Sequence, residues 1–79
     1  MPHVIVKLYP GRTEEQKKRL AEAIARNVVD IAQCAETSVS VAIEEVHPDD
    51  WTEKVYKPDL LNSAHTLYKE PGYNPLQVR

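Results

Sequence analysis

The chain has 79 residues, enough for one small domain over residues 1–79 with a modest core. A single cysteine excludes a disulfide framework, and ten basic against twelve acidic residues leave a formal charge of −2, without the basic footprint of a nucleic-acid-binding protein. Apolar runs are too short to cross a membrane, and no signal peptide is visible. We therefore expect a cytoplasmic protein that binds neither nucleic acid nor membrane and is stabilised by self-association.

A β-strand is predicted over residues 3–9. Valine, valine and leucine at positions 4, 6 and 8 alternate with other residues, which is the period of a half-buried strand. The Pro10-Gly11 pair ends the strand and leaves Arg12 in the following turn.

A long helix is predicted from Thr13 to about Gln33. Thr13 and Gln16 have the spacing of a capping box, in which each side chain bonds the backbone of the other residue. Apolar residues then recur at helical spacing. This stripe consists of Leu20, Ile24, Val28 and Ile31, flanked by Ala21, Val29 and Ala32.

Residues 35–38 form a predicted connector, and alternation of apolar residues predicts a second strand over residues 39–46. Strand, helix and strand make an α/β (α+β) unit whose two strands run parallel with a right-handed crossover. Two strands leave edges and one sheet face uncovered. We therefore expect a second copy of the chain to extend or cover the sheet.

The remaining chain is predicted to form short helices. One covers residues 50–55, and another begins near Pro58, because proline suits the first turn of a helix. An apolar stripe follows in the second helix: Leu60, Leu61, Ala64, Leu67 and Tyr68. Residues 73–79 read as an extended tail that lies across a partner subunit.

Pro2 is the first candidate for chemistry. Proline is common at this position because small second residues permit removal of the initiator methionine. Once Met1 is removed, however, Pro2 carries a free amine at the start of a strand. Burial there disfavours the charged form and lowers the pKa of the amine from about 8 toward neutrality, where a general base works best.

Arg12 and Trp51 are the next candidates. A turn arginine is commonly solvent-exposed, but a guanidinium also binds carboxylates through paired hydrogen bonds. Arg12 lies at the carboxyl end of the first strand and Pro2 at the other end, so a neighbouring subunit is needed to bring them together. Trp51 suits a core, an interface or the wall of an apolar pocket.

No metal or cofactor is expected. The three histidines and Cys34 have no metal-ligand spacing, and nucleotide-binding motifs are absent. His3 is expected to be a residue of the strand face first and a site residue second, and Lys7 and Tyr9 are possible pocket residues that the sequence does not rank.

These residues resemble the 4-oxalocrotonate tautomerase family. The resemblance covers residues 2–51 and rests on Pro2, on Gly11-Arg12 with the following Glu15-Gln16-Lys17, on Thr37-Ser38-Val39-x-Val41, on Glu45-Val46, and on the aromatic Trp51. Residues 52–79 resemble a longer branch, the bacterial phenylpyruvate tautomerase-like proteins, which are homodimers. The resemblance implies a βαβ fold whose sheet is extended by dimerisation.

The resemblance also implies roles for these residues. Pro2 is the base that takes a proton from a 2-hydroxy enol and returns it to carbon, which gives a 2-oxo acid. Arg12 binds the substrate carboxylate, and Trp51 walls the pocket. Ser40 stands where the shorter enzymes carry a second, carboxylate-binding arginine. We therefore expect a small-molecule substrate of the monocarboxylic type, such as the enol of phenylpyruvate, in preference to a diacid.

Two alternatives remain open. The same amine supports hydration, dehalogenation or an aldol-type addition through an iminium. A dimeric binding module with weak or lost activity is the non-enzymatic alternative, to which Ser40 points. A retained Met1 would point there too, because it would acylate the Pro2 nitrogen.

Overall fold

The computed structural model describes residues 1–76. They fall into two compact units, Met1–Glu45 and a second unit that starts at Val46. The first unit contains two strands and the long helix, and the second contains three short helices. In the described part of the chain, no helix is long and apolar enough to cross a membrane.

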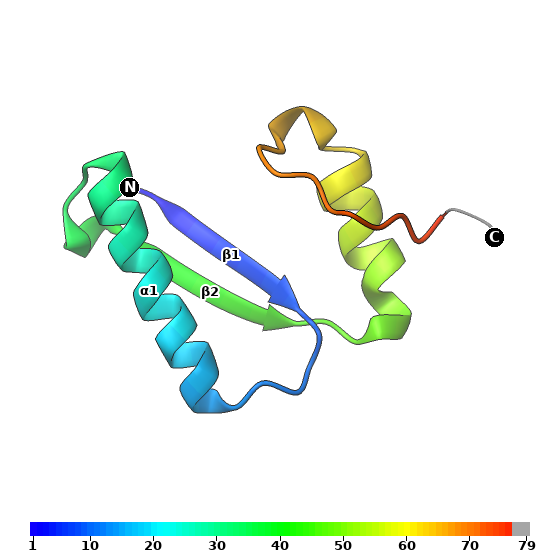
Figure 1. The fold of residues 1–79 in the computed structure, drawn as a ribbon, viewed down its shortest axis with the longest axis horizontal. Helices are drawn as coiled ribbons and strands as arrows, with labels where there is room; N and C mark the ends of the chain where they lie inside the picture. The colour runs from blue at the N-terminus through cyan, green and yellow to red at the C-terminus, as the bar shows by residue number, and fades with distance from the viewer. Residues whose placement is uncertain (77–79) are drawn as a thin grey trace. The chain divides into compact units, whose positions relative to one another are not determined.

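The two strands of the first unit form a parallel sheet. Strand β1 (His3–Leu8) pairs with β2 (Ser40–Glu45), and Figure 1 shows them side by side and pointing the same way. Each is shorter than predicted. Strand β1 stops one residue before the predicted end, because Tyr9 is followed by Pro10, which has no N–H for a sheet. Strand β2 starts one residue later than predicted, because the Val39 N–H closes a 3₁₀ turn on the Glu36 carbonyl and is unavailable to the sheet. This turn, η1 (Glu36–Ser38), takes the place of the predicted connector.

Helix α1 (Glu14–Ala32) confirms the predicted helix and its capping box. The Thr13 hydroxyl accepts from the Gln16 N–H at 3.1 Å, and the Gln16 side chain accepts from the Thr13 N–H at 2.8 Å. Gln33 ends the helix in the left-handed conformation, with φ 55°. These contacts satisfy backbone groups that the helix itself leaves unpaired.

The half-buried stripe of α1 differs in part from the prediction. Ile24 and Val28 are half-buried, as expected, but Leu20 is 38% exposed and Ile31 is 82% exposed. The half-buried positions follow helical spacing: Lys17, Ala21, Ile24, Ala25, Val28 and Val29. Of the four residues predicted to define the stripe, Leu20 and Ile31 are therefore less covered by this chain than Ile24 and Val28.

The strand register determines which side chains share a sheet face. His3 is opposite Ser40, and Leu8 is opposite Glu45. The Glu45 carboxylate lies 3.6 Å from the Lys17 ammonium of α1, so Leu8 and Glu45 belong to the face that α1 covers. The other face, called here the helix-free face, comprises His3, Ile5 and Lys7 of β1 and Ser40, Ala42 and Glu44 of β2.

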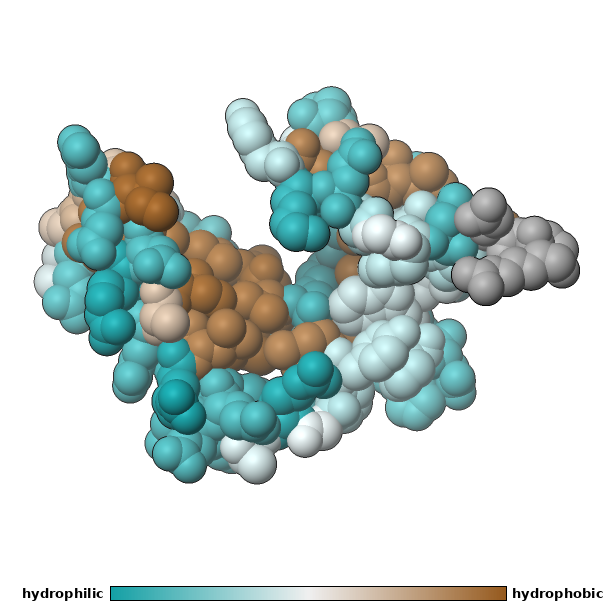
Figure 2. All heavy atoms as spheres, in the orientation of Figure 1, coloured by the Kyte–Doolittle hydropathy of each residue, from teal (hydrophilic) through white to brown (hydrophobic). Residues whose placement is uncertain are grey.

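The first unit contains no buried residue, although several apolar side chains are half-buried. Figure 2 shows apolar atoms gathered over the strands of this unit. Ile5 on the helix-free face is 49% exposed, and Tyr9, just beyond β1, is 44% exposed. A sheet this poorly covered in a chain of 79 residues favours self-association.

The second unit corrects the prediction of two separate helices. After a 3₁₀ turn, η2 (Pro48–Asp50), a single π-helix, η3 (Thr52–Leu61), runs through Pro58. In an α-helix the proline ring clashes with the carbonyl four residues earlier, whereas the wider π turn bonds five residues back. The Asn62 N–H accordingly donates to the Lys57 carbonyl at 2.9 Å.

The apolar stripe predicted beyond Pro58 does not form one helix. Helix η3 ends at Leu61, and a 3₁₀ turn, η4 (Ala64–Thr66), follows. Tyr68 is fully exposed. The small core of this unit consists instead of Val55 and Tyr56, which are 4% and 9% exposed.

The predicted tail folds back within its own unit at Tyr73. The Tyr73 and Tyr56 rings are 5.8 Å apart between centroids and tilted by 47°. Aromatic pairs at this separation are stabilising. The last three residues of the predicted tail, 77–79, lie outside the described part of the chain.

Candidate active site

Pro2 is held against the sheet at the amino-terminal end of β1. It is half-buried, and its carbonyl accepts a hydrogen bond from the Ser40 N–H at 3.2 Å. The preceding Met1 is fully exposed. While Met1 is attached, the Pro2 nitrogen is an amide nitrogen and has no basicity. Removal of Met1 would leave a secondary amine on Pro2, whose backbone is already fixed by the sheet.

Arg12 lies beyond the opposite end of β1, one residue before the cap of α1. Gly11 adopts φ +128°, a conformation that residues with a side chain rarely adopt, although a side chain there would meet no neighbouring atom. The glycine therefore serves the turn and not close packing. Arg12 is exposed, and no hydrogen bond or ion pair with the described residues occupies its guanidinium.

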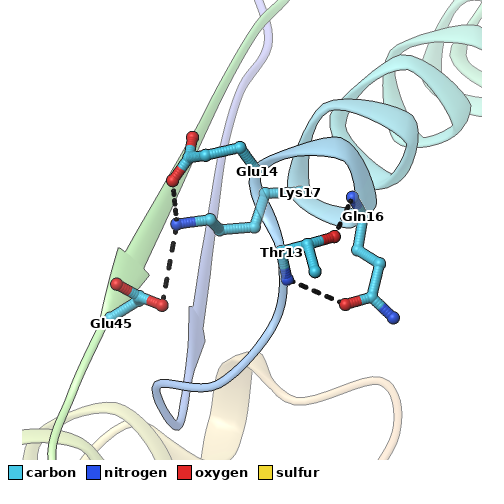
Figure 3. Close-up of polar contacts among 5 residues, drawn as sticks. All are labelled: Thr13, Glu14, Gln16, Lys17 and Glu45. Atoms are coloured by element: carbon cyan, nitrogen blue, oxygen red, sulfur yellow. Dashed lines mark hydrogen bonds and ion pairs between the residues drawn. The ribbon is translucent and has the colours of Figure 1, made fainter.

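The nearby Lys17 is, by contrast, already paired. Its ammonium lies 2.7 Å from the Glu14 carboxylate and 3.6 Å from that of Glu45, as Figure 3 shows. The hydrogen bond between Lys17 and Glu14 lowers the pKa of Glu14 and raises the pKa of Lys17. Of these two cations, Arg12 is thus the one available to an incoming carboxylate.

Ser40 and His3 face each other across the strands, next to Pro2. The Ser40 Oγ lies 2.6 Å from the His3 Nδ1, and the two residues are direct partners in the register. Sequence reasoning singled out Ser40 but treated His3 mainly as a strand-face residue. The parallel register was the signal that could have paired them.

Trp51 lies in the second unit, where it is half-buried at the start of η3. Its indole N–H donates to the Tyr73 hydroxyl at 2.8 Å. Tyr73 also packs on Tyr56, so the indole is oriented by a residue that itself is held in place. Sequence reasoning missed this role of Tyr73, because two residues that are 22 positions apart in the sequence give no local signal.

Within one chain, the structure thus brings Pro2, His3 and Ser40 together at one end of the sheet. It does not bring Arg12 to them, since β1 separates Arg12 from Pro2. Among the residues that the structure describes, no three histidine, cysteine or acidic side chains are grouped as a metal site requires.

Comparison with known proteins identifies the family. The family model described as tautomerase enzyme matches residues 2–55. A probable tautomerase of Xylella fastidiosa is 41% identical over 76 residues, which are 96% of this chain and 93% of that protein. Tautomerase PptA of Pectobacterium carotovorum is 40% identical and covers 94% of this chain and 99% of its own length.

Solved structures agree. YwhB, a homologue of 4-oxalocrotonate tautomerase, is 40% identical, with a TM-score of 0.59 over 61% of this chain and 79% of that chain. A 4-oxalocrotonate tautomerase homologue from Staphylococcus aureus is 36% identical, with a TM-score of 0.58 over 60% of this chain and 76% of that chain. The fold, the family model, the related sequences and the solved structures all indicate the same family. The chain therefore belongs to the tautomerase enzyme family, in the 4-oxalocrotonate tautomerase group of isomerases.

Proposed function

We propose that the chain is a cofactor-independent tautomerase that converts enols of 2-oxo acids into their keto forms. The single observation that carries the proposal is the anchoring of Pro2. Its carbonyl is bonded to Ser40 in the sheet, so the nitrogen exposed by removal of Met1 has a fixed position. A fixed, half-buried secondary amine suits a general base.

In the proposed reaction, the Pro2 nitrogen takes the proton of the substrate 2-hydroxyl group. A carbonyl forms at C2, and the electron pair of the C2–C3 double bond takes the proton back from the Pro2 ammonium at C3. The amine is then free for the next substrate. Such proton transfer by a positioned group contributes about 100- to 10,000-fold to the rate.

Arg12 would bind the substrate carboxylate through paired hydrogen bonds, because its guanidinium is exposed and unoccupied by the described residues. Since Arg12 and Pro2 lie beyond opposite ends of β1, we propose that the Arg12 of one subunit serves the Pro2 of another, in a homodimer. Trp51 would wall the apolar side of the pocket.

Ser40 would restrict the substrate class. A hydroxyl group offers neither the charge nor the reach of an arginine, so a second carboxylate at this position would lack a cationic partner. We therefore propose that monocarboxylic enols with an aryl or alkyl group, such as phenylenolpyruvate, are preferred over diacids such as 2-hydroxymuconate.

The Pro2→Ala variant tests the proposal. Alanine also permits removal of Met1 but supplies a primary amine without the ring that directs the nitrogen lone pair. We expect kcat/KM for phenylenolpyruvate ketonisation to fall by at least about a hundredfold. Circular dichroism serves as the folding control. Turnover at the wild-type rate by the folded variant would refute the role of Pro2.

A further inference from the structure

His3 and Ser40 form a short hydrogen bond on the helix-free face of the sheet. Its length is 2.6 Å between the His3 Nδ1 and the Ser40 Oγ. A serine hydroxyl can donate to a ring nitrogen or accept from one, so the tautomer of the ring goes with the direction of this bond. With the Ser40 hydroxyl as the donor, the His3 Nδ1 is the acceptor.

This direction determines the tautomer of His3. A neutral imidazole carries one N–H, and a ring whose Nδ1 accepts a hydrogen bond carries its proton on Nε2. In this arrangement Ser40 holds His3 as the Nε2–H tautomer. The ring is exposed on the helix-free face, so its Nε2–H is available as a donor.

The same pair adjoins the proposed base. His3 follows Pro2 directly, and consecutive Cα atoms are about 3.8 Å apart. Ser40 contacts both residues, since its backbone N–H donates to the Pro2 carbonyl and its hydroxyl is hydrogen-bonded to the His3 ring. One serine therefore fixes the backbone that carries the base and the orientation of the neighbouring donor.

We propose that His3 is a catalytic residue of the tautomerase, whose Nε2–H donates a hydrogen bond to the oxygen on C2 of the substrate. The inference rests on the proposed function of Pro2 and adds the group that stabilises the charge which Pro2 creates. When Pro2 removes the 2-hydroxyl proton, negative charge develops on that oxygen. The His3 N–H stabilises the charge until the carbonyl forms and C3 is protonated.

The reaction balances without further reagents. The proton leaves oxygen for the Pro2 nitrogen and reaches C3 from it, while the His3 proton stays on Nε2 throughout. His3 thus supplies a hydrogen bond and not a proton. It would occupy, with Ser40, the position where an arginine would otherwise bind the same end of the substrate, and it does so without adding a second permanent charge.

Two substitutions of His3 separate this role from a structural one. Glutamine places its amide nitrogen near the position of Nε2, whereas asparagine places its amide near Nδ1 and keeps only a partner for Ser40. We expect kcat for phenylenolpyruvate to fall by about a hundredfold in His3→Asn, the usual loss for one removed oxyanion donor. In His3→Gln the fall should stay within about tenfold. The matched control is His65→Asn, at an exposed histidine in η4.

Equal kcat values in His3→Asn and His3→Gln would overturn the proposal, because the Nε2 position would then be irrelevant. A wild-type kcat in His3→Asn would overturn it as well. Failure of the proposed function has a different signature, which is wild-type turnover in Pro2→Ala. The two failures are therefore distinguishable in one series of assays.

Nitrogen NMR of the histidine ring provides a second test that needs no turnover. In wild-type protein, His3 should carry its proton on Nε2, and Ser40→Ala should increase the Nδ1–H form. Saturation with the product phenylpyruvate should shift the His3 Nε2–H resonance. A predominant Nδ1–H form in the wild-type protein, or a resonance unmoved by saturating phenylpyruvate, would contradict the proposal.

Discussion

Ser40 is the residue that we propose narrows the substrate class. Its backbone belongs to the ladder that fixes Pro2, and its side chain is engaged with His3. Neither contact supplies positive charge. The proposed selection against diacids rests on this lack of charge, because an unpaired carboxylate would lose water without gaining a cationic partner.

Replacing Ser40 with arginine should therefore change specificity. We expect the ratio of kcat/KM for 2-hydroxymuconate to that for phenylenolpyruvate to rise by about ten- to a hundredfold in Ser40→Arg, the effect of a charged hydrogen bond. Ser40→Gln, which is long but uncharged, is the matched control. An unchanged ratio in Ser40→Arg, or an equal rise in Ser40→Gln, would show that charge at position 40 does not select the substrate. In the wild-type enzyme, a higher kcat/KM for 2-hydroxymuconate than for phenylenolpyruvate would refute the preference.

At the scale of single residues, the sequence indicated candidate site residues better than it indicated which residues contact each other. Pro2, Arg12, Ser40 and Trp51 were all singled out, and their roles remain predictions. The His3–Ser40 contact was missed, because alternation within one strand says which way His3 points but not which residue lies opposite. That requires the register between the two strands, whose paired residues are 37 positions apart in the sequence.

Among the elements, α1 was the most predictable. Its limits depend on local signals, namely the Thr13–Gln16 capping box and a periodic apolar pattern, and both were present in the sequence. Helix η3 was less predictable. Pro58 suggested a new helix, but the π turns accommodate the ring and the helix continues.

The contact between η3 and the C-terminal segment leads to a prediction about Trp51. Tyr73→Phe keeps the ring that packs on Tyr56 but removes the oxygen that accepts from the indole N–H. We expect Trp51 to be less restrained and KM for phenylenolpyruvate to rise by a few-fold, about the effect of one neutral hydrogen bond, with a smaller change in kcat.

Trp51 is the only tryptophan, so its fluorescence reports the environment of the indole directly. The emission maximum and anisotropy should change in Tyr73→Phe but not in Tyr68→Phe, whose tyrosine is fully exposed. Fluorescence and KM identical to the wild type in Tyr73→Phe would show that Tyr73 does not orient Trp51.

For the whole molecule, the limiting feature is the amount of core. The first unit has no buried residue, and the core of the second consists of Val55 and Tyr56. The exposed apolar residues of the first unit include Ile5, Tyr9, Leu20 and Ile31. We expect a second subunit to cover such residues. The sequence of one chain shows that they are apolar but not that a partner covers them.

Subunit sharing of the site makes a quantitative prediction. Pro2→Ala and Arg12→Gln homodimers should each be nearly inactive. If Arg12 acts on the Pro2 of its partner, a mixed dimer has one intact site, and random exchange between equal amounts should restore about a quarter of wild-type activity. Native mass spectrometry of the mixture, with one variant labelled with ¹⁵N, verifies that subunits exchange. No recovery despite exchange would place both residues in one subunit.

The free amine of Pro2 is the central claim, and removal of Met1 tests it most directly. Protein that retains Met1, verified by mass, should be at least about a hundredfold less active toward phenylenolpyruvate than the same protein after treatment with methionine aminopeptidase. The two samples differ only in one exposed residue. A gain of activity that follows the fraction of chains beginning at Pro2 is the predicted result. Equal activity before and after complete removal of Met1 would contradict the account.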